Sequence, residues 1–181
     1  MRDYETLIPE MRNWNNGSGI AVEDWFACSA SFDLMIAASY LYWPEFVVYE
    51  GCVFKLPFTQ NDRDNYHRLS RIENVSKSYI EERINNETIV DLFPNVSPTL
   101  DQVLFIGRTL SDAWKTKLSR DFPDRSFVVS FPELEGDKLE DYEITFFQTD
   151  PPKIKKANKS VDATARSPVV KSTSTAPTHH L

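Results

Sequence analysis

Residue 150 divides this chain into two parts, and only the first has the composition of a folded core. All 23 aromatic residues and all five glycines precede Asp150. Aromatic side chains bury roughly 150–250 Å² each, so they supply most of the apolar area for a core. We therefore expect a single acidic globular domain over residues 1–150. The rest is rich in Lys, Ser, Thr and Pro without periodicity, which predicts a disordered basic tail over residues 151–181.

Charge separates the same two parts. Residues 1–150 hold 26 Asp and Glu against 14 Lys and Arg, whereas residues 151–181 hold six Lys and Arg against one Asp. The net charge of −7 for the whole chain therefore understates the acidity of the part that is expected to fold. An acidic surface attracts basic proteins and repels nucleic-acid phosphates. We therefore expect a basic protein partner. Binding of nucleic acid is disfavoured for the acidic domain and is an alternative only for the basic tail.

The sequence carries no sign of a membrane segment. No apolar run approaches the ~20 residues that a membrane-spanning helix needs, and the first residues lack the apolar stretch of a secretion signal. Cys28 and Cys52 have no metal-binding spacing and suit reduced thiols among apolar neighbours. We therefore expect a cytoplasmic protein without a membrane partner.

The pattern of apolar residues predicts an α+β fold in which four to five helices pack on a small, mostly antiparallel sheet. The clearest helix covers residues 98–120, where apolar side chains recur every three or four positions and Ser97 is a suitable cap. Gly107 lies on that apolar stripe, which indicates a close neighbour. A helix over residues 31–43 is apolar around most of its circumference, so we expect it to be central and buried.

Three β-rich runs supply the strands. Residues 126–131 and 142–147 alternate apolar and polar positions and predict a hairpin. Residues 46–56 are also β-rich but are interrupted at Glu50-Gly51. They predict either a tight hairpin or one strand with a glycine bulge, and Glu-Gly is not a preferred two-residue turn.

A polar segment over residues 59–93 predicts two or three helices, with Glu81 and Glu82 on a solvated face. It holds His67, the one histidine before the tail, in a run of charged residues. His67 could act as a general base oriented by Asp64. An ordinary surface histidine is the alternative, because no serine or cysteine in a recognisable nucleophile setting accompanies it.

Motifs that would name a chemistry are missing from this sequence. It contains no Walker loop, dinucleotide-binding glycine pattern, zinc-binding cysteine cluster or calcium loop. We therefore expect no cofactor and no metal; a non-catalytic protein is favoured, and enzymatic activity stays open as an alternative.

The segment from Tyr40 to Phe46 concentrates aromatic residues. Its seven residues hold four rings, too many to lie on one face of a helix or strand. Some of Tyr40, Tyr42 and Trp43 are therefore expected at a surface, where Tyr and Trp anchor protein interfaces. With Glu45 they form the candidate binding site; a helix end wedged into the core is the alternative.

Three functions follow from these features. The first is a non-catalytic binding protein, for example an immunity-like neutraliser of a basic partner. The second is a small hydrolase or transferase that uses His67 with nearby carboxylates. The third is a nucleic-acid accessory factor that contacts phosphate through the basic tail. The tail's cations are Lys153, Lys155, Lys156, Lys159, Arg166 and Lys171.

Overall fold

The computed structural model describes residues 3–132 and 138–149, and the predicted tail lies outside this part. The described residues form six α-helices and two small antiparallel sheets, which confirms the α+β class. Four to five helices were expected, so the structure has one more than predicted. The helices are α1 Tyr4–Leu7, α2 Val22–Ser29, α3 Phe32–Tyr42, α4 Gln60–Ser70, α5 Lys77–Ile84 and α6 Leu100–Asp121. The strands are β1 Phe46–Tyr49, β2 Cys52–Lys55, β3 Glu87–Thr88, β4 Phe127–Ser130 and β5 Glu143–Gln148. Short 3-10 helices lie at Pro9–Asn13, Asn15–Gly17, Val90–Leu92 and Leu139–Asp141.

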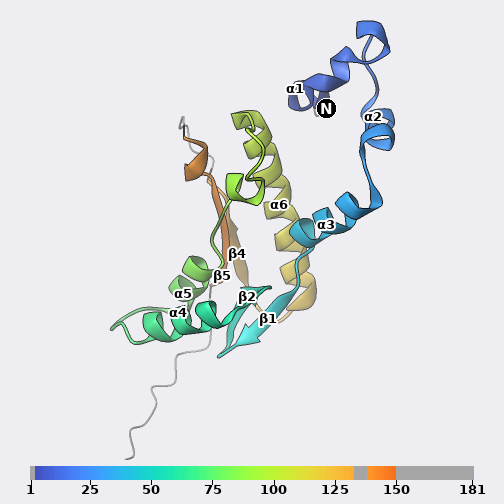
Figure 1. Cartoon of the computed structure of the whole chain (residues 1–181). Coiled ribbons are helices and arrows are strands. Elements are labelled where there is room, and N and C mark those ends of the chain that lie inside the picture. Colours follow the sequence, from blue (N-terminus) through green and yellow to red (C-terminus); the bar gives the residue numbers. More distant parts are fainter. Residues whose placement is uncertain (1–2, 133–137, 150–181) are drawn as a thin grey trace, which may run out of the picture.

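Helix α6 is the centre of the molecule (Figure 1). Thr99 caps it, not Ser97, because Thr99 and Gln102 form a reciprocal capping box. Its buried face packs against the sheet of β3, β5 and β4, and Trp114 and Leu118 are fully buried there. Gly107 lies on this face with the Phe131 ring directly over it, so the predicted close neighbour is confirmed.

Strands β1 and β2 form a tight hairpin, which decides between the two arrangements that the sequence allows. Tyr49 pairs with Cys52, leaving a two-residue turn. Glu50 and Gly51 both have positive φ angles, 52° and 85°. This is the backbone twist that two-residue hairpins favour, although Glu is an uncommon residue there.

The predicted hairpin of β4 and β5 is confirmed. These strands pair antiparallel from Phe127 opposite Gln148 to Ser130 opposite Thr145. Strand β3 pairs with the other edge of β5, but only over Glu87 and its neighbour Thr88. The rest of that edge of β5 therefore needs other hydrogen-bond partners.

Helix α5 supplies those partners through Glu81, which was expected on a solvated face and is instead fully buried. The Glu81 carboxylate accepts hydrogen bonds from the backbone N–H groups of Val53 (2.6 Å) and Gln148 (2.7 Å). It also accepts one from the Gln148 side chain at 2.5 Å. One side chain thus joins β2 to β5.

Asn85, one helical turn after Glu81, repeats the connection. Its side-chain amide donates to the carbonyls of Val53 (3.0 Å) and Phe146 (3.2 Å), and its oxygen accepts from the Lys55 N–H (3.1 Å). The two sheets are therefore held together by polar side chains of a helix in place of a strand. The solvated-face expectation was wrong for Glu81 because these strand edges require buried acceptors and donors.

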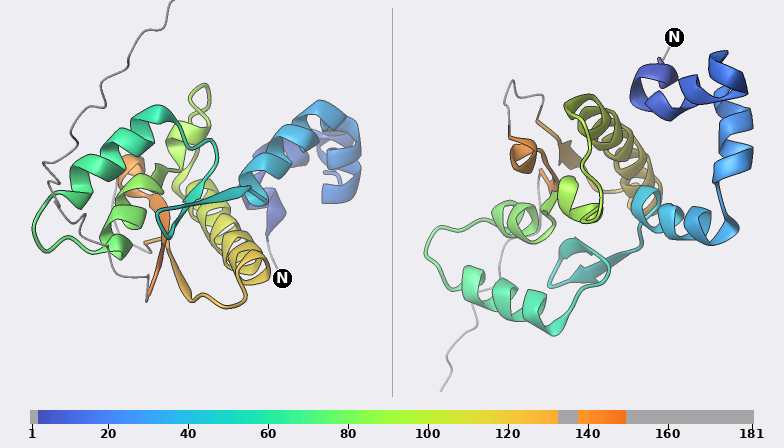
Figure 2. Two further views of the ribbon diagram at one scale, coloured as in Figure 1. Left: turned by 90° about the horizontal axis from the view of Figure 1, so that it is seen from below. Right: turned by 45° about the horizontal axis from the view of Figure 1, so that its top comes forward.

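The expectation of a central, buried helix over residues 31–43 was wrong. Helix α3 forms there, capped by Ser31, but none of its residues is buried, and Phe32 is 89% exposed. Figures 1 and 2 show why: α2 and the start of α3, in blue, stand away from the rest of the molecule, and only the end of α3 lies beside α6. We call residues 4–43 the N-terminal arm.

The arm meets α6 near both of its own ends. At one end the Gln102 side chain donates to the Leu7 carbonyl at 2.8 Å, and the rings of Tyr4 and Phe105 meet edge to face. At the other end the Trp114 indole N–H donates to the Leu41 carbonyl at 2.8 Å. The apolar side chains between these anchor points have few neighbours to cover them.

Candidate functional site

Three of the four predicted binding residues line one open cavity at the end of α3. Tyr40, Trp43 and Glu45 face Leu56, Pro57 and Phe58 across a volume of about 660 Å³, with Ser39 completing the lining. We call this cavity the Trp43 groove. Tyr42 does not line it, because its side chain is half-buried, and burial raises the pKa of its hydroxyl.

Backbone geometry at the end of α3 builds the groove. The Trp43 N–H donates to the Ser39 carbonyl at 2.8 Å and closes the helix, and Pro44 follows as a buried stop. Glu45 then accepts a backbone hydrogen bond from the Leu56 N–H at 2.9 Å. The Tyr40 hydroxyl donates to the Leu56 carbonyl and ties the helix to the segment after β2.

Cations lie against the aromatic rings of the groove from the side of the core. The Lys117 ammonium is 5.8 Å from the centre of the Trp43 ring, and the Arg120 guanidinium is 6.0 Å from it. Lys55 lies 5.5 Å from the centre of the Tyr40 ring and pairs with Glu87 at 2.5 Å. These contacts stabilise the positions of the rings, although the cation–π attraction at such partly exposed rings is worth only about 0.5–1 kcal/mol each.

Carboxylates dominate the sequence around the groove. Residues 13–54 contain five Asp and Glu and no Lys, Arg or His. Glu45 is exposed at the groove and has no ion-pair partner among residues 3–132 and 138–149. The arm is therefore acidic along residues 13–43, whereas the groove holds the Glu45 carboxylate together with the cations of Lys117 and Arg120 beside Trp43.

Exposed apolar side chains concentrate in the same region. Of the 13 large hydrophobic side chains that are exposed in the described part, seven lie between residues 26 and 43. They are Phe26, Phe32, Leu34, Met35, Ile36, Tyr40 and Trp43. Contiguous exposed apolar surface of this kind is typical of interaction sites. Exposure of Phe32, Leu34, Met35 and Ile36 was not predicted from the sequence, because the apolar helix over residues 31–43 was expected in the core. The absence of Lys, Arg and His from residues 13–54 was the available signal of an unusual surface.

No family model, curated protein or solved structure matches this chain.

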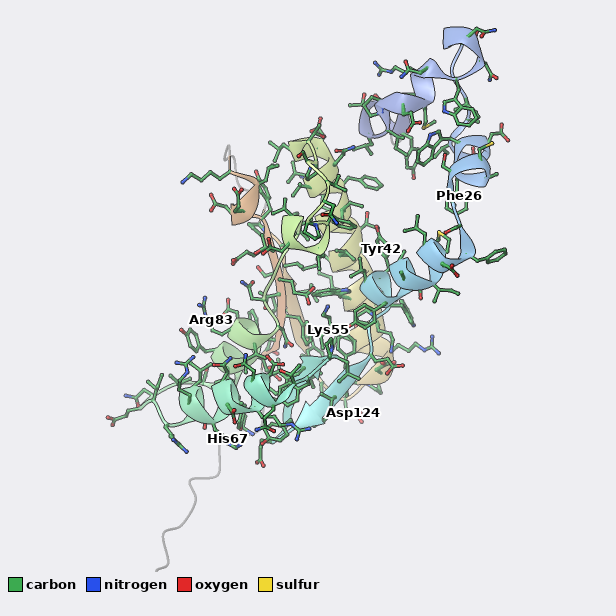
Figure 3. All side chains as sticks on the ribbon, in the orientation of Figure 1. Phe26, Tyr42, Lys55, His67, Arg83 and Asp124 are labelled. Carbon is green, nitrogen blue, oxygen red and sulfur yellow. The ribbon has the colours of Figure 1, made fainter. Side chains whose placement is uncertain are left out.

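His67 lies exposed on α4, far from the arm (Figure 3). Its Nε2 is 2.9 Å from the Tyr49 hydroxyl, and its ring stands edge to face against Tyr49 and Tyr66. Asp64 accepts a hydrogen bond from the Gln60 side chain at 3.0 Å. The structure thus pairs His67 with a tyrosine, and the proposed role of Asp64 as its orienting carboxylate stays a prediction.

A second, smaller cavity lies under the start of the arm. It has a volume of about 290 Å³ and is almost wholly apolar. Its lining includes Tyr4 and Leu7 of α1 and Val103 and Ile106 of α6. The side-chain amide of Gln102 also borders it but is already bonded to Leu7 and Thr99. This cavity therefore offers packing space without a polar group to orient a ligand.

Within the described residues, no group of three or more His, Cys, Asp or Glu is placed to hold a metal ion. A membrane crossing would need a longer or more apolar helix than any in the described part of the chain.

The two cysteines are expected to differ sharply in reactivity toward a disulfide reagent in the native protein. Cys28 is exposed on α2, whereas Cys52 is fully buried, and burial raises the pKa of the Cys52 thiol to about 12. We expect one thiol to react at once at mildly alkaline pH and the second only after unfolding. Cys28→Ser should abolish the fast phase, and equal rates for both thiols would contradict the described packing of β2.

Proposed function

We propose that this protein is a non-catalytic binding protein that holds a basic protein partner at the Trp43 groove, in the manner of an immunity protein. The observation that carries the proposal is the combination of exposed aromatic anchors with an unpaired carboxylate. Tyr40 and Trp43 are 43% and 41% exposed, and Glu45 lies beside them. Tyr and Trp in a concave site are frequent anchors of protein interfaces.

Rigidity of the anchors supports this function. Tyr40 is tied by its hydroxyl to Leu56, and Trp43 is held against Lys117 and Arg120. An anchor that is already fixed loses little side-chain entropy when a partner binds. The acidic charge of residues 1–150 adds a long-range attraction that raises the association rate with a basic protein at low salt.

Affinity capture with matched variants tests the proposal. The full chain is immobilised and exposed to lysate of the source organism at low and at high ionic strength, and bound proteins are quantified by mass spectrometry. We expect a basic protein to be retained by the native chain and lost with Tyr40→Ala plus Trp43→Ala. Purified, it should bind more weakly as salt rises, because screening shortens the reach of surface charge.

Ile72→Ser is the matched control, because Ile72 is also an exposed apolar side chain but lies beyond the end of α4. It should retain the partner at the native level. Circular dichroism of each variant shows whether the fold is kept. Retention of the same protein by the Tyr40 and Trp43 double variant, or enrichment of acidic proteins only, would overturn the proposal.

A further inference from the structure

We infer that the exposed stripe of α3 binds an amphipathic basic helix of the partner, which continues from the Trp43 groove along the arm. This inference rests on the proposed function and adds the shape and chemistry of the partner segment. The stripe consists of Phe32, Met35, Ile36, Tyr40 and Trp43.

Spacing places these five side chains on one face of the helix. They follow one another at steps of three, one, four and three residues, which is the pattern of a single helical face. Phe32 and Ile36, farthest from the core, are 89% and 69% exposed, and Met35 is 42% exposed. The stripe ends at Trp43 and therefore opens directly into the groove.

The C-terminal end of α3 attaches it to the body. Leu41 accepts the hydrogen bond of the Trp114 indole, and Leu41 and Tyr42 pack against the main core. In Figure 3, Tyr42 lies on the side of α3 that faces α6. The helix is thus anchored at its C-terminal end, and this anchoring leaves Phe32, Met35 and Ile36 of the stripe exposed.

Charge decides what kind of surface covers the stripe. Asp33 lies beside Phe32 on α3, Glu45 follows Trp43, and Glu23 and Asp24 precede the stripe on α2. Residues 13–54 contain no Lys, Arg or His, and the nearby cations Lys117 and Arg120 of α6 lie only at the Trp43 end of the stripe. A second copy of this chain would therefore bring the acidic residues of α2 and α3 together around the apolar contact. A helix with an apolar face and flanking Lys and Arg instead matches both the apolar stripe and the acidic residues beside it.

The length of α3 sets the size of the contact. Its 11 residues extend about 16 Å at 1.5 Å per residue, so about three turns of a partner helix lie along it. Recognition of this kind uses apolar side chains at positions i, i+3, i+4 and i+7 of the bound helix. The partner segment is therefore expected to repeat Leu, Ile or Phe at these positions, with basic residues on its flanks.

Fluorescence anisotropy with labelled model peptides tests the inference on the full chain. The probe is an amphipathic peptide of Leu and Lys with about 18 residues, which forms five helical turns. One control peptide replaces each Lys by Glu, and another scrambles the Leu and Lys order so that no apolar face forms. We expect the native chain to bind the ordered Leu–Lys peptide at least about tenfold more tightly than either control.

Variants separate the stripe from the groove. Phe32→Ser plus Ile36→Ser should weaken binding of the ordered peptide by about tenfold or more without changing the thermal midpoint, because both side chains are exposed. Ile72→Ser serves again as the matched control. If the Phe32→Ser plus Ile36→Ser variant binds the peptide with unchanged affinity, the stripe inference alone is overturned. The proposed function would still be supported if the native chain captures a partner and Tyr40→Ala plus Trp43→Ala abolishes that capture.

Two further outcomes would overturn the inference in distinguishable ways. Equal affinity for the Leu–Lys and Leu–Glu peptides would show that the stripe does not select a basic helix and would overturn the inference, while the proposed function would still be decided by the capture experiment. Sedimentation that shows a native dimer dissociated by Phe32→Ser plus Ile36→Ser would assign the stripe to a second copy of this chain. In that case the role of the Trp43 groove would still be decided by the capture experiment.

Discussion

Replacing Trp114 with alanine is expected to lower the free energy of unfolding by about 3–5 kcal/mol, the usual range for removing a large buried aromatic side chain. Trp114 is fully buried on α6, meets the Phe146 ring edge to face at 6.0 Å, and lies under the Lys55 ammonium. Alanine would leave a cavity between α6, the sheet and the arm. Urea unfolding followed by circular dichroism measures the change.

A second substitution at the same position removes the hydrogen bond to the arm with a smaller loss of core volume. Trp114→Phe keeps an aromatic ring but leaves the Leu41 carbonyl without its donor, which costs about 1–3 kcal/mol if water cannot reach it. Since Leu41 belongs to α3, amide hydrogens of that helix should also exchange faster with solvent. Lys115→Ala, at an exposed position of α6, is the control and should change stability by less than about 0.5 kcal/mol. A Trp114→Ala change as small as that of the control would contradict the described core.

Replacing Glu81 with alanine is expected to lower the free energy of unfolding by about 3 kcal/mol or more, because each buried N–H group left unpaired costs about 1–3 kcal/mol. The carboxylate accepts three hydrogen bonds, from Val53 and from the backbone and side chain of Gln148. These are the contacts that join β2 to β5 across α5. Urea unfolding measures the loss, and Glu73→Gln, at an exposed carboxylate, is the control.

The pH dependence of this site has a definite sign. Burial raises the pKa of Glu81 above its ordinary value of 4.5, and the hydrogen bonds from Gln148 and Val53 oppose the shift only in part. A carboxyl group with a raised pKa binds its proton more tightly in the folded than in the unfolded chain. Its contribution to stability is therefore complete below pH 4.5 and is lost as the pH rises through the folded pKa.

Comparison with Glu81→Gln measures this effect, because glutamine does not titrate and the other carboxyl groups cancel in the difference. The free energy of unfolding of the native chain, minus that of Glu81→Gln, should be largest below pH 4.5 and should decrease toward neutral pH. The same comparison for Glu73→Gln serves as the control. A difference that grows with rising pH would show that the pKa of Glu81 is lowered in the folded protein.

Elements with a strong local signal could be predicted from the sequence. The apolar stripe of α6 and the alternation in β4 and β5 depend on residues close together in the chain, and both elements formed as expected. The same stripe correctly indicated a close neighbour at Gly107. The groove was partly predictable: four rings in seven residues cannot share one face, and Tyr40 and Trp43 are indeed exposed.

Turn geometry and burial of charge were not predictable in this way. Glu50-Gly51 adopts a hairpin turn because the pairing of β1 with β2 imposes positive φ angles on both residues. Glu81 is buried because two strand edges, distant in the sequence, lack other hydrogen-bond partners there. In both cases the determining contact joins residues that no local pattern relates.

By itself, the sequence determined the α+β class and the acidity of residues 1–150, since periodicity and charge are properties of the chain. It also determined that α3 is an apolar helix. Only the tertiary structure decided whether another part of the molecule covers that helix, because a core helix and an interface helix have the same apolar pattern. Here α3 contacts the body through Tyr40, Leu41 and Tyr42 at its C-terminal end and leaves Phe32 and Ile36 exposed, so this part of its apolar surface remains available to a partner.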